Sequence, residues 1–253
     1  MKKIKLLTAA TLLTSIVVGN VATVYAAENG HEIQTEGTVS FTAGDDNEVI
    51  PPVEPPVVID PIDPDDQGPL SILYAPTIAF GTQKISPNKE TYQMIAEKQK
   101  LITGELIPYV SFAQVVDTRG TNAGWTLAVT ASQFKNNNTT NKELTGATIT
   151  LLESNLAYSG EKGQEPTISN ADITLTPEES VTIMSAEKGT GALISSVVWG
   201  DQSELDKEFL AANDPDANIL NEKITLEVPG KIAKDAVTYT ASLEWSLTNT
   251  PGN

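Results

Sequence analysis

The sequence has no cysteine, a single histidine and a single arginine among its 253 residues, and only 6% of the residues are aromatic. Without cysteine the chain has neither disulfides nor a thiol nucleophile, so its stability must come from an ordinary hydrophobic core. The histidine, His31, lies in an acidic segment close to a proline-rich run, where a Ser–His–Asp arrangement is not expected. These absences argue against nucleophilic catalysis, and we expect neither enzymatic activity nor a cofactor.

Basic residues are also scarce, with 16 Lys and Arg against 33 Asp and Glu and a formal net charge of −17. Such a surface repels nucleic acid and anionic membranes, so we expect no nucleic-acid partner. The many carboxylates leave a glycosidase-type pair as an alternative, but no spacing singles one out. Residues 63–68 and 214–218 begin like calcium loops but lack the bidentate Glu at position 12, so we expect no metal site.

The first residues have the features of an export signal. A basic start is followed by an apolar run over residues 6–18, and Val24 and Ala26 fit the −3 and −1 positions of a cleavage site. We predict a signal peptide over residues 1–26 and a secreted chain with no membrane span. An uncleaved anchor is the alternative, but no charged residue follows the run at once. The last residues contain no Leu-Pro-x-Thr-Gly sequence, so we expect non-covalent attachment to the cell surface.

After the signal peptide, composition divides the chain into two parts. Residues 27–69 form an acidic, proline-rich arm that we expect to be extended or disordered, except for a short strand at residues 37–43. Residues 70–253 are rich in Thr, Val, Ile, Leu and Ser, with short apolar alternations between turn residues. This pattern predicts a single all-β domain, an antiparallel Ig-like β-sandwich. The expected strands are residues 70–75, 105–111, 114–118, 124–132, 147–153, 167–175, 180–185, 193–199, 223–228 and 236–248, and residues 204–212 are expected to form a short helix.

Two of these strands carry the same Trp-x-Leu pattern. Trp125 and Leu127 lie two residues apart, as do Trp245 and Leu247, and residues two apart in a strand share a face. Each motif therefore places its tryptophan and leucine on one side of the sheet. The sequence leaves two roles open. The face packs in the core, as most Trp–Leu faces do, or it forms an apolar strip on which sugar rings stack. Trp199 is expected in the core or at its rim.

Arg119 stands just before the first motif, two residues from Asp117 on what should be the same strand face. One interpretation is that the pair contacts a glycan or a peptide carboxylate. The other is an ordinary ion pair that contributes little to stability.

Taken together, these motifs resemble the WxL domain of Gram-positive surface proteins over nearly the whole mature chain. The resemblance includes Gly-Thr-Val-Ser-Phe-Thr at residues 37–42, the acidic proline-rich stretch, Asp-Thr-Arg-Gly at residues 117–120, and both Trp-x-Leu motifs in order. It implies non-covalent binding to the cell wall, to its peptidoglycan in particular, at the surface of a Gram-positive bacterium. It also implies work in a surface adhesion complex. In the alternative that we keep, the chain is a structural subunit that binds a WxL-interacting protein or a host matrix protein instead of glycan.

Overall fold

The computed structural model describes residues 36–44, 48–53 and 66–250, and the predicted signal peptide at residues 1–26 lies outside them. The strands of this described part all pair antiparallel, and they are accompanied by one short helix. The all-β, antiparallel sandwich predicted from the sequence is therefore confirmed.

The strands form three four-stranded sheets and one two-stranded sheet. In spatial order, the first sheet contains β1 (Leu70–Tyr74), β5 (Ser111–Asp117), β12 (Leu193–Trp199) and β8 (Asn155–Tyr158). The second contains β10 (Ile173–Leu175), β7 (Thr148–Leu151), β13 (Leu220–Val228) and β2 (Glu90–Ile95). The third contains β14 (Leu243–Thr248), β6 (Trp125–Ala131), β11 (Ser180–Ala186) and β9 (Thr167–Ile168). The short hairpin joins β3 (Glu97–Lys100) to β4 (Leu106–Tyr109), and α1 covers Gln202–Ala212.

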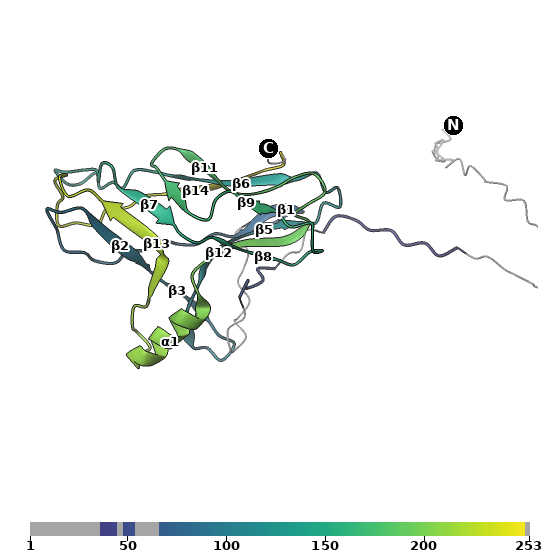
Figure 1. Ribbon diagram of the computed structural model, residues 1–253, viewed down its shortest axis with the longest axis horizontal. Helices are drawn as coiled ribbons and strands as arrows, with labels where there is room; N and C mark the ends of the chain where they lie inside the picture. The colour runs from purple at the N-terminus through teal and green to yellow at the C-terminus, as the bar shows by residue number, and fades with distance from the viewer. Residues whose placement is uncertain (1–35, 45–47, 54–65, 251–253) are drawn as a thin grey trace, which may run out of the picture. The chain divides into compact units, whose positions relative to one another are not determined.

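The main core contains buried side chains from all three large sheets. Strands β6 and β11 contribute from the third sheet, β5 and β12 from the first, and β7, β10 and β13 from the second. Figure 1 shows β6, β11 and β14 together on the side of the domain away from α1. The alternation along β6 matches this arrangement, because every second residue from Trp125 to Ala131 is buried while those between are half-exposed.

A second core lies on the other face of the first sheet. All seven residues of β5 are buried, and Phe112 and Val116 belong to this second cluster while Ala113 and Val115 belong to the main one. Leu205 of α1 and Tyr109 of β4 cover it. Because both faces are covered, the polar residues of β5 are buried as well, and Gln114 and Asp117 form hydrogen bonds there with Ile50 and Arg119.

Part of the acidic arm also packs here. Val49 is 5% exposed and joins the second core. The amide of Ile50 donates to Oε1 of Gln114 over 2.9 Å, and the Val53 backbone exchanges hydrogen bonds with the Tyr109 hydroxyl. Residues 48–53 are thus held against the domain by apolar packing and by these hydrogen bonds, contacts that the composition of the arm does not predict.

Residues 36–44 have less regular structure than we expected. They have no regular secondary structure, so the short strand expected at residues 37–43 is not formed in the structure. Val39 is 76% exposed and Phe41 is 89% exposed. A strand needs a neighbour for its backbone N–H and C=O groups and a surface on which to bury one face. The neighbour is present at Gly44, whose amide donates to the Thr118 carbonyl oxygen over 3.4 Å and whose carbonyl oxygen accepts from the Thr118 hydroxyl over 2.8 Å, but Val39 and Phe41 bury no face.

Candidate functional site

The two Trp-x-Leu motifs lie side by side in the third sheet. Strands β6 and β14 pair antiparallel, with Trp245 opposite Val129 and Leu247 opposite Leu127. Both motifs turn their tryptophan and leucine toward the main core. The alternation in the sequence therefore gave the correct shared face for each motif, and the structure shows that this face points inward.

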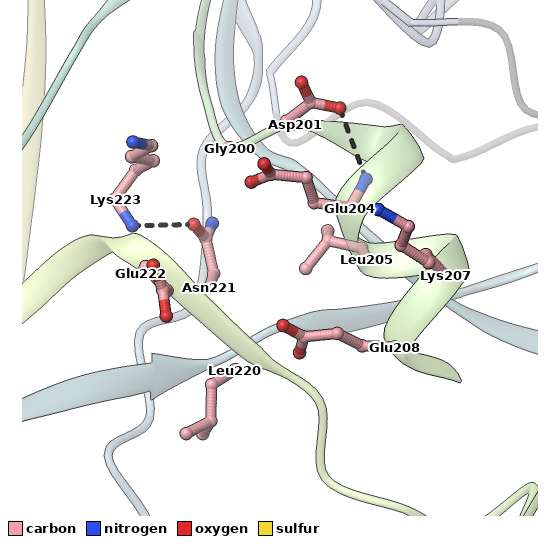
Figure 2. A pocket seen from close by; sticks show the side chains of 10 residues that line it. All are labelled: Gly200, Asp201, Glu204, Leu205, Lys207, Glu208, Leu220, Asn221, Glu222 and Lys223. Atoms are coloured by element: carbon pink, nitrogen blue, oxygen red, sulfur yellow. Dashed lines mark hydrogen bonds between the residues drawn. The ribbon is translucent and has the colours of Figure 1, made fainter. Parts of the chain in front are cut away.

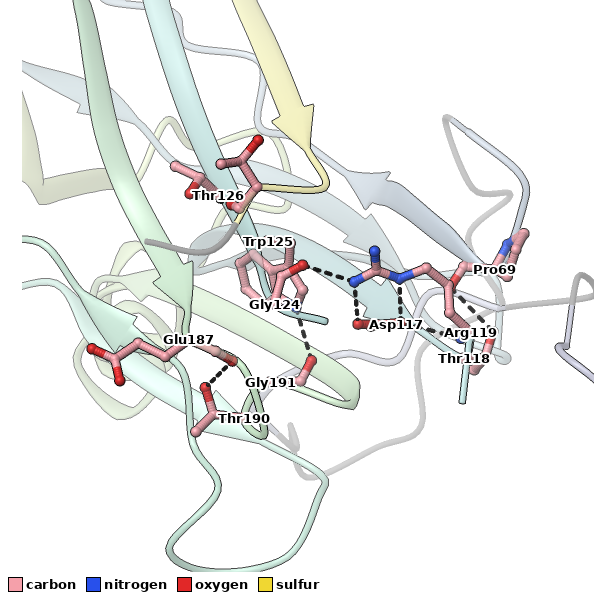
Figure 3. Close-up of polar contacts among 11 residues, drawn as sticks. Pro69, Asp117, Thr118, Arg119, Gly124, Trp125, Thr126, Glu187, Thr190 and Gly191 are labelled. Carbon is pink, nitrogen blue, oxygen red and sulfur yellow. Dashed lines mark hydrogen bonds and ion pairs between the residues drawn. The ribbon is translucent and has the colours of Figure 1, made fainter. Parts of the chain in front are cut away.

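The first motif is completely buried. Trp125 and Leu127 have no exposed surface, and the indole N–H of Trp125 donates to the carbonyl oxygen of Gly191 over 2.9 Å. Figure 3 shows this hydrogen bond between Trp125 and Gly191. A side chain without exposed surface offers no ring face to a sugar, so this geometry favours the core-packing interpretation of the first motif.

Two glycines allow close packing around the first motif. Gly191 has φ +69°, and a Cβ there would lie 2.4 Å from the Ala186 Cβ and 2.9 Å from Nε1 of Trp125. Gly124 has φ +84°, and a Cβ there would lie 2.5 Å from the Ala186 carbonyl oxygen. Any other residue at these positions would require a strained backbone, and it would press on the tryptophan at position 191 and on the backbone of Ala186 at position 124.

The second motif is only partly buried. Strand β14 is the edge of its sheet, so Trp245 and Leu247 are covered on one flank and half-exposed. The Trp245 ring lies 6.4 Å from that of Trp199, centroid to centroid, at an interplanar angle of 45°. Trp199 itself is buried, and its N–H donates to the Ser154 hydroxyl over 2.8 Å. Of the three tryptophans, Trp245 is therefore the one with surface left for a ligand.

The Arg119–Asp117 pair is an internal contact. The guanidinium donates to both carboxylate oxygens of Asp117, from Nε over 2.9 Å and from Nη2 over 2.6 Å. Nη2 also donates to the carbonyl oxygen of Gly124 over 2.9 Å, which fixes the turn before the first motif (Figure 3). The hydrogen bond to Asp117 raises the pKa of Arg119 above its usual value. Only 16% of the arginine side chain and 1% of the aspartate side chain are exposed, which favours the ion-pair interpretation over ligand contact.

A hollow lies elsewhere, in a feature that we call the loop cleft. It has a volume of about 880 Å³, and its two walls are residues 78–85 and residues 234–241. Its floor is apolar and comes from the second sheet: Tyr92 of β2, Ile149 of β7, and Leu226 and Val228 of β13. Burial, together with the nearby carboxylate of Glu90, raises the pKa of the Tyr92 hydroxyl, which stays neutral.

A hydrogen-bond network fixes one wall of the loop cleft. The Asp235 carboxylate accepts from the Thr139 hydroxyl, from the Asn141 amide N–H over 2.8 Å and from the Asn141 side chain over 2.7 Å. These donors hold the pKa of Asp235 down to about 2. The Tyr239 hydroxyl donates to the Asn141 carbonyl oxygen over 2.6 Å and accepts from the Asp235 amide. Residues 235–239 are thus tied to the loop at residues 139–141.

A smaller hollow of about 210 Å³ lies between α1 and β13 (Figure 2). Its side chains are mostly charged, but Asp201 is occupied as the helix cap and accepts from the amides of Ser203 and Glu204. Within the described ranges, no group of three or more His, Cys, Asp or Glu residues is placed to hold a metal ion. Nor does that part of the chain contain a helix with the length and apolar character needed to cross a membrane.

The sequence pointed to the motifs and did not reveal the loop cleft. The structure brings together the two Trp-x-Leu motifs and, just beside Trp125, the Arg119–Asp117 pair, but none of these six residues lines the cleft. One feature of the sequence does point to the cleft. The apolar alternation of the second motif extends toward the N-terminus, and the residues of this extension, Leu243, Ala241 and Tyr239, line the cleft.

Comparison with known protein families gives one match over nearly the whole chain. The model described as "WxL domain surface cell wall-binding" matches residues 28–251. No curated protein and no solved structure matches the chain.

Proposed function

Because the chain belongs to the WxL domain surface cell wall-binding family, we propose that it is a non-enzymatic surface protein that binds the peptidoglycan of a Gram-positive cell wall. The attachment is non-covalent and is made by the β domain, and the protein takes part in a surface adhesion complex. The observation that carries this proposal is the family match, which covers the motif strands, the sandwich and most of the arm.

Two features of the structure support binding without catalysis. The six site residues expected from the sequence act within the fold: the first motif is core, the second is half-buried at a sheet edge, and Arg119 is paired with Asp117. The loop cleft, with its apolar floor, has a size suited to a ligand. Retention of the protein at the cell wall therefore requires no catalytic group, because a preformed cleft on a rigid β-sheet is sufficient.

A pull-down on sacculi tests the proposal. The exported form of the chain, residues 27–253, is mixed with protein-stripped sacculi and centrifuged, and we expect the protein in the pellet. Muropeptides and reducing sugars are measured in the same supernatant over hours, and we expect no release above buffer alone. Protein that stays in the supernatant would contradict wall binding, and steady muropeptide release would contradict the non-enzymatic assignment.

One observation favours the alternative of a protein partner. Val39 and Phe41 alternate with polar residues in a segment whose two large apolar side chains are exposed. Exposed apolar side chains in strand-like alternation are suited to pairing with another chain. If the chain is not retained by sacculi but is captured by an immobilised WxL-interacting protein or by a matrix protein such as collagen, the structural-subunit function replaces wall binding.

A further inference from the structure

The loop cleft has the size and lining of a ligand site. A volume of about 880 Å³ lies within the range of roughly 300–1,000 Å³ that is usual for such sites. Its floor is formed by the second sheet, which is rigid because β13 pairs on both sides, with β7 and with β2. One wall is tied down by the Asp235 network, so the cleft does not have to form when a ligand arrives.

The cleft is also a local concentration of positive charge on an acidic protein. Lys84 lies in one wall and Lys234 in the other. Nζ of Lys234 is near three neutral acceptors, the carbonyl oxygens of Ser86 at 3.2 Å, Ile232 at 3.3 Å and Gly230 at 3.5 Å. Neither lysine forms an ion pair with another described residue. An anionic group entering the cleft would thus meet two cations that no described carboxylate neutralises.

The single acidic residue in the lining does not cancel this preference. Asp235 already accepts hydrogen bonds from Thr139 and Asn141 on both of its oxygens, and its low pKa reflects these contacts. Its lone pairs are engaged within the wall. The carboxylate is nevertheless ionised, so the lining carries two positive charges and one negative charge, and the net charge offered to a ligand is positive.

Free backbone groups run along the other wall. From Gly81 to Ile85, the backbone N–H and C=O groups make no hydrogen bond with any residue in the part of the chain that the structure describes, and these residues are exposed. The one contact at this turn is the Gln83 side chain, which donates to the carbonyl oxygen of Phe80 over 2.7 Å. An extended peptide can pair with such a wall through its own main chain.

We propose that the loop cleft binds a short extended peptide with small apolar side chains and a free carboxylate, the chemistry that the stem peptides of peptidoglycan present. This assignment rests on the proposed function and names the part of the wall that is recognised. The floor takes the apolar side chains, the backbone of residues 81–85 pairs with the peptide main chain, and Lys84 attracts the carboxylate. Lys234, whose Nζ donates to three nearby carbonyl oxygens, adds only its positive charge. An uncharged glycan could bond the hydroxyls of Thr82, Thr238 and Thr240, but it would leave the lysines without a counter-charge.

The test uses stem peptides released from sacculi by an amidase, labelled with a fluorophore, and binding is followed by anisotropy on the 27–253 chain. Two variants change the cleft: Ala236→Trp narrows its mouth at an exposed position, and Lys84→Glu reverses one charge. Their controls are Ala211→Trp on α1 and Lys188→Glu after β11, both at exposed positions outside the cleft. We expect each cleft variant to bind the peptides at least tenfold more weakly, and each control to bind like the unchanged chain, with all four melting alike.

The outcomes separate the two proposals. If the unchanged chain is not retained by sacculi, wall binding fails and this assignment fails with it. If it is retained but both cleft variants bind the stem peptides normally, wall binding stands and the cleft is not the site. Competition by peptide-free glycan strands, or loss of retention once teichoic acid is stripped, would overturn the peptide assignment in favour of a sugar or a phosphate polymer.

Discussion

Replacing Trp125 by alanine should reveal whether the first motif supports the fold or the ligand. The side chain has no exposed surface, lies in the main core with Leu127 and Val129, and donates its N–H to Gly191. Removing a buried tryptophan costs about 3–5 kcal/mol, because apolar contacts are lost and a cavity remains. Domains of this size unfold with a total of roughly 5–15 kcal/mol, so the change takes a large share of the stability.

This cost corresponds to a fall in melting temperature of about 6–20 °C, at roughly 2–4 °C per kcal/mol for a domain of this size. Trp245→Ala is the matched comparison, since the same side chain is removed from a half-exposed site on the sheet edge. It should lower the melting temperature by clearly less. Circular dichroism melts of both variants give the two shifts, and sacculus retention is measured well below both transitions. We expect folded Trp125→Ala protein to be retained. A variant that melts like the unchanged chain but is no longer retained would refute this reasoning and assign Trp125 a direct role in binding.

Three further predictions concern the contacts around the motifs, the cleft and the arm. Arg119→Met leaves the buried carboxylate of Asp117 without its partner, and it should lower the free energy of unfolding, measured by urea denaturation, by on the order of 3–5 kcal/mol. Adding Asp117→Asn should recover much of this loss, and no recovery would contradict the ion-pair interpretation. Asp235 has a folded-state pKa of about 2, below the unfolded value near 3.9, so its stabilising contribution is present above pH 4 and disappears as the pH falls through 2. Asp235→Asn should therefore lower the melting temperature at pH 6 but make little difference near pH 2, and an equal shift at both would show that the carboxylate is not responsible. Limited proteolysis between Val53 and Gly68 should leave the N-terminal piece attached on a sizing column, because Val49, Ile50 and Val53 are held by the second core, Gln114 and Tyr109. Dissociation would show that these contacts are too weak to hold it.

Strands with a clear alternation were predictable from the sequence. Residues 193–199 match β12 at both ends, and residues 124–132 contain β6 with one extra residue at each end. The helix expected at residues 204–212 is α1, which begins two residues earlier because Asp201 caps it. In each case the local pattern and the packing favour the same structure, so the sequence is sufficient.

The prediction is less accurate where packing between distant segments decides. Residues 236–248 read as one long strand, but only Leu243–Thr248 forms β14, and the part before it becomes a wall of the loop cleft held by Asn141. Residues 167–175 divide into β9 and β10, which belong to different sheets. Strand β3 was missed although its partner β4 follows it directly in a hairpin, and β8 was not expected, since its partner β12 is far away in sequence. The cleft could not be predicted for the same reason: its walls are about 150 residues apart in the sequence.

We propose that the Trp-x-Leu motifs mark the binding domain mainly through its fold. Trp245 contacts Trp199 across the main core, and the same face of the chain continues back through Leu243 and Ala241 into the lining of the cleft. Packing of the buried motif on β6 against the half-buried motif on β14 therefore fixes the position of the chain that enters the cleft wall. Loss of a motif tryptophan should reduce wall binding in proportion to the unfolded fraction, whereas loss of Lys84 should reduce it in a fully folded protein. Retention at low temperature, where both proteins are folded, distinguishes these two effects, because only the change in the cleft persists there.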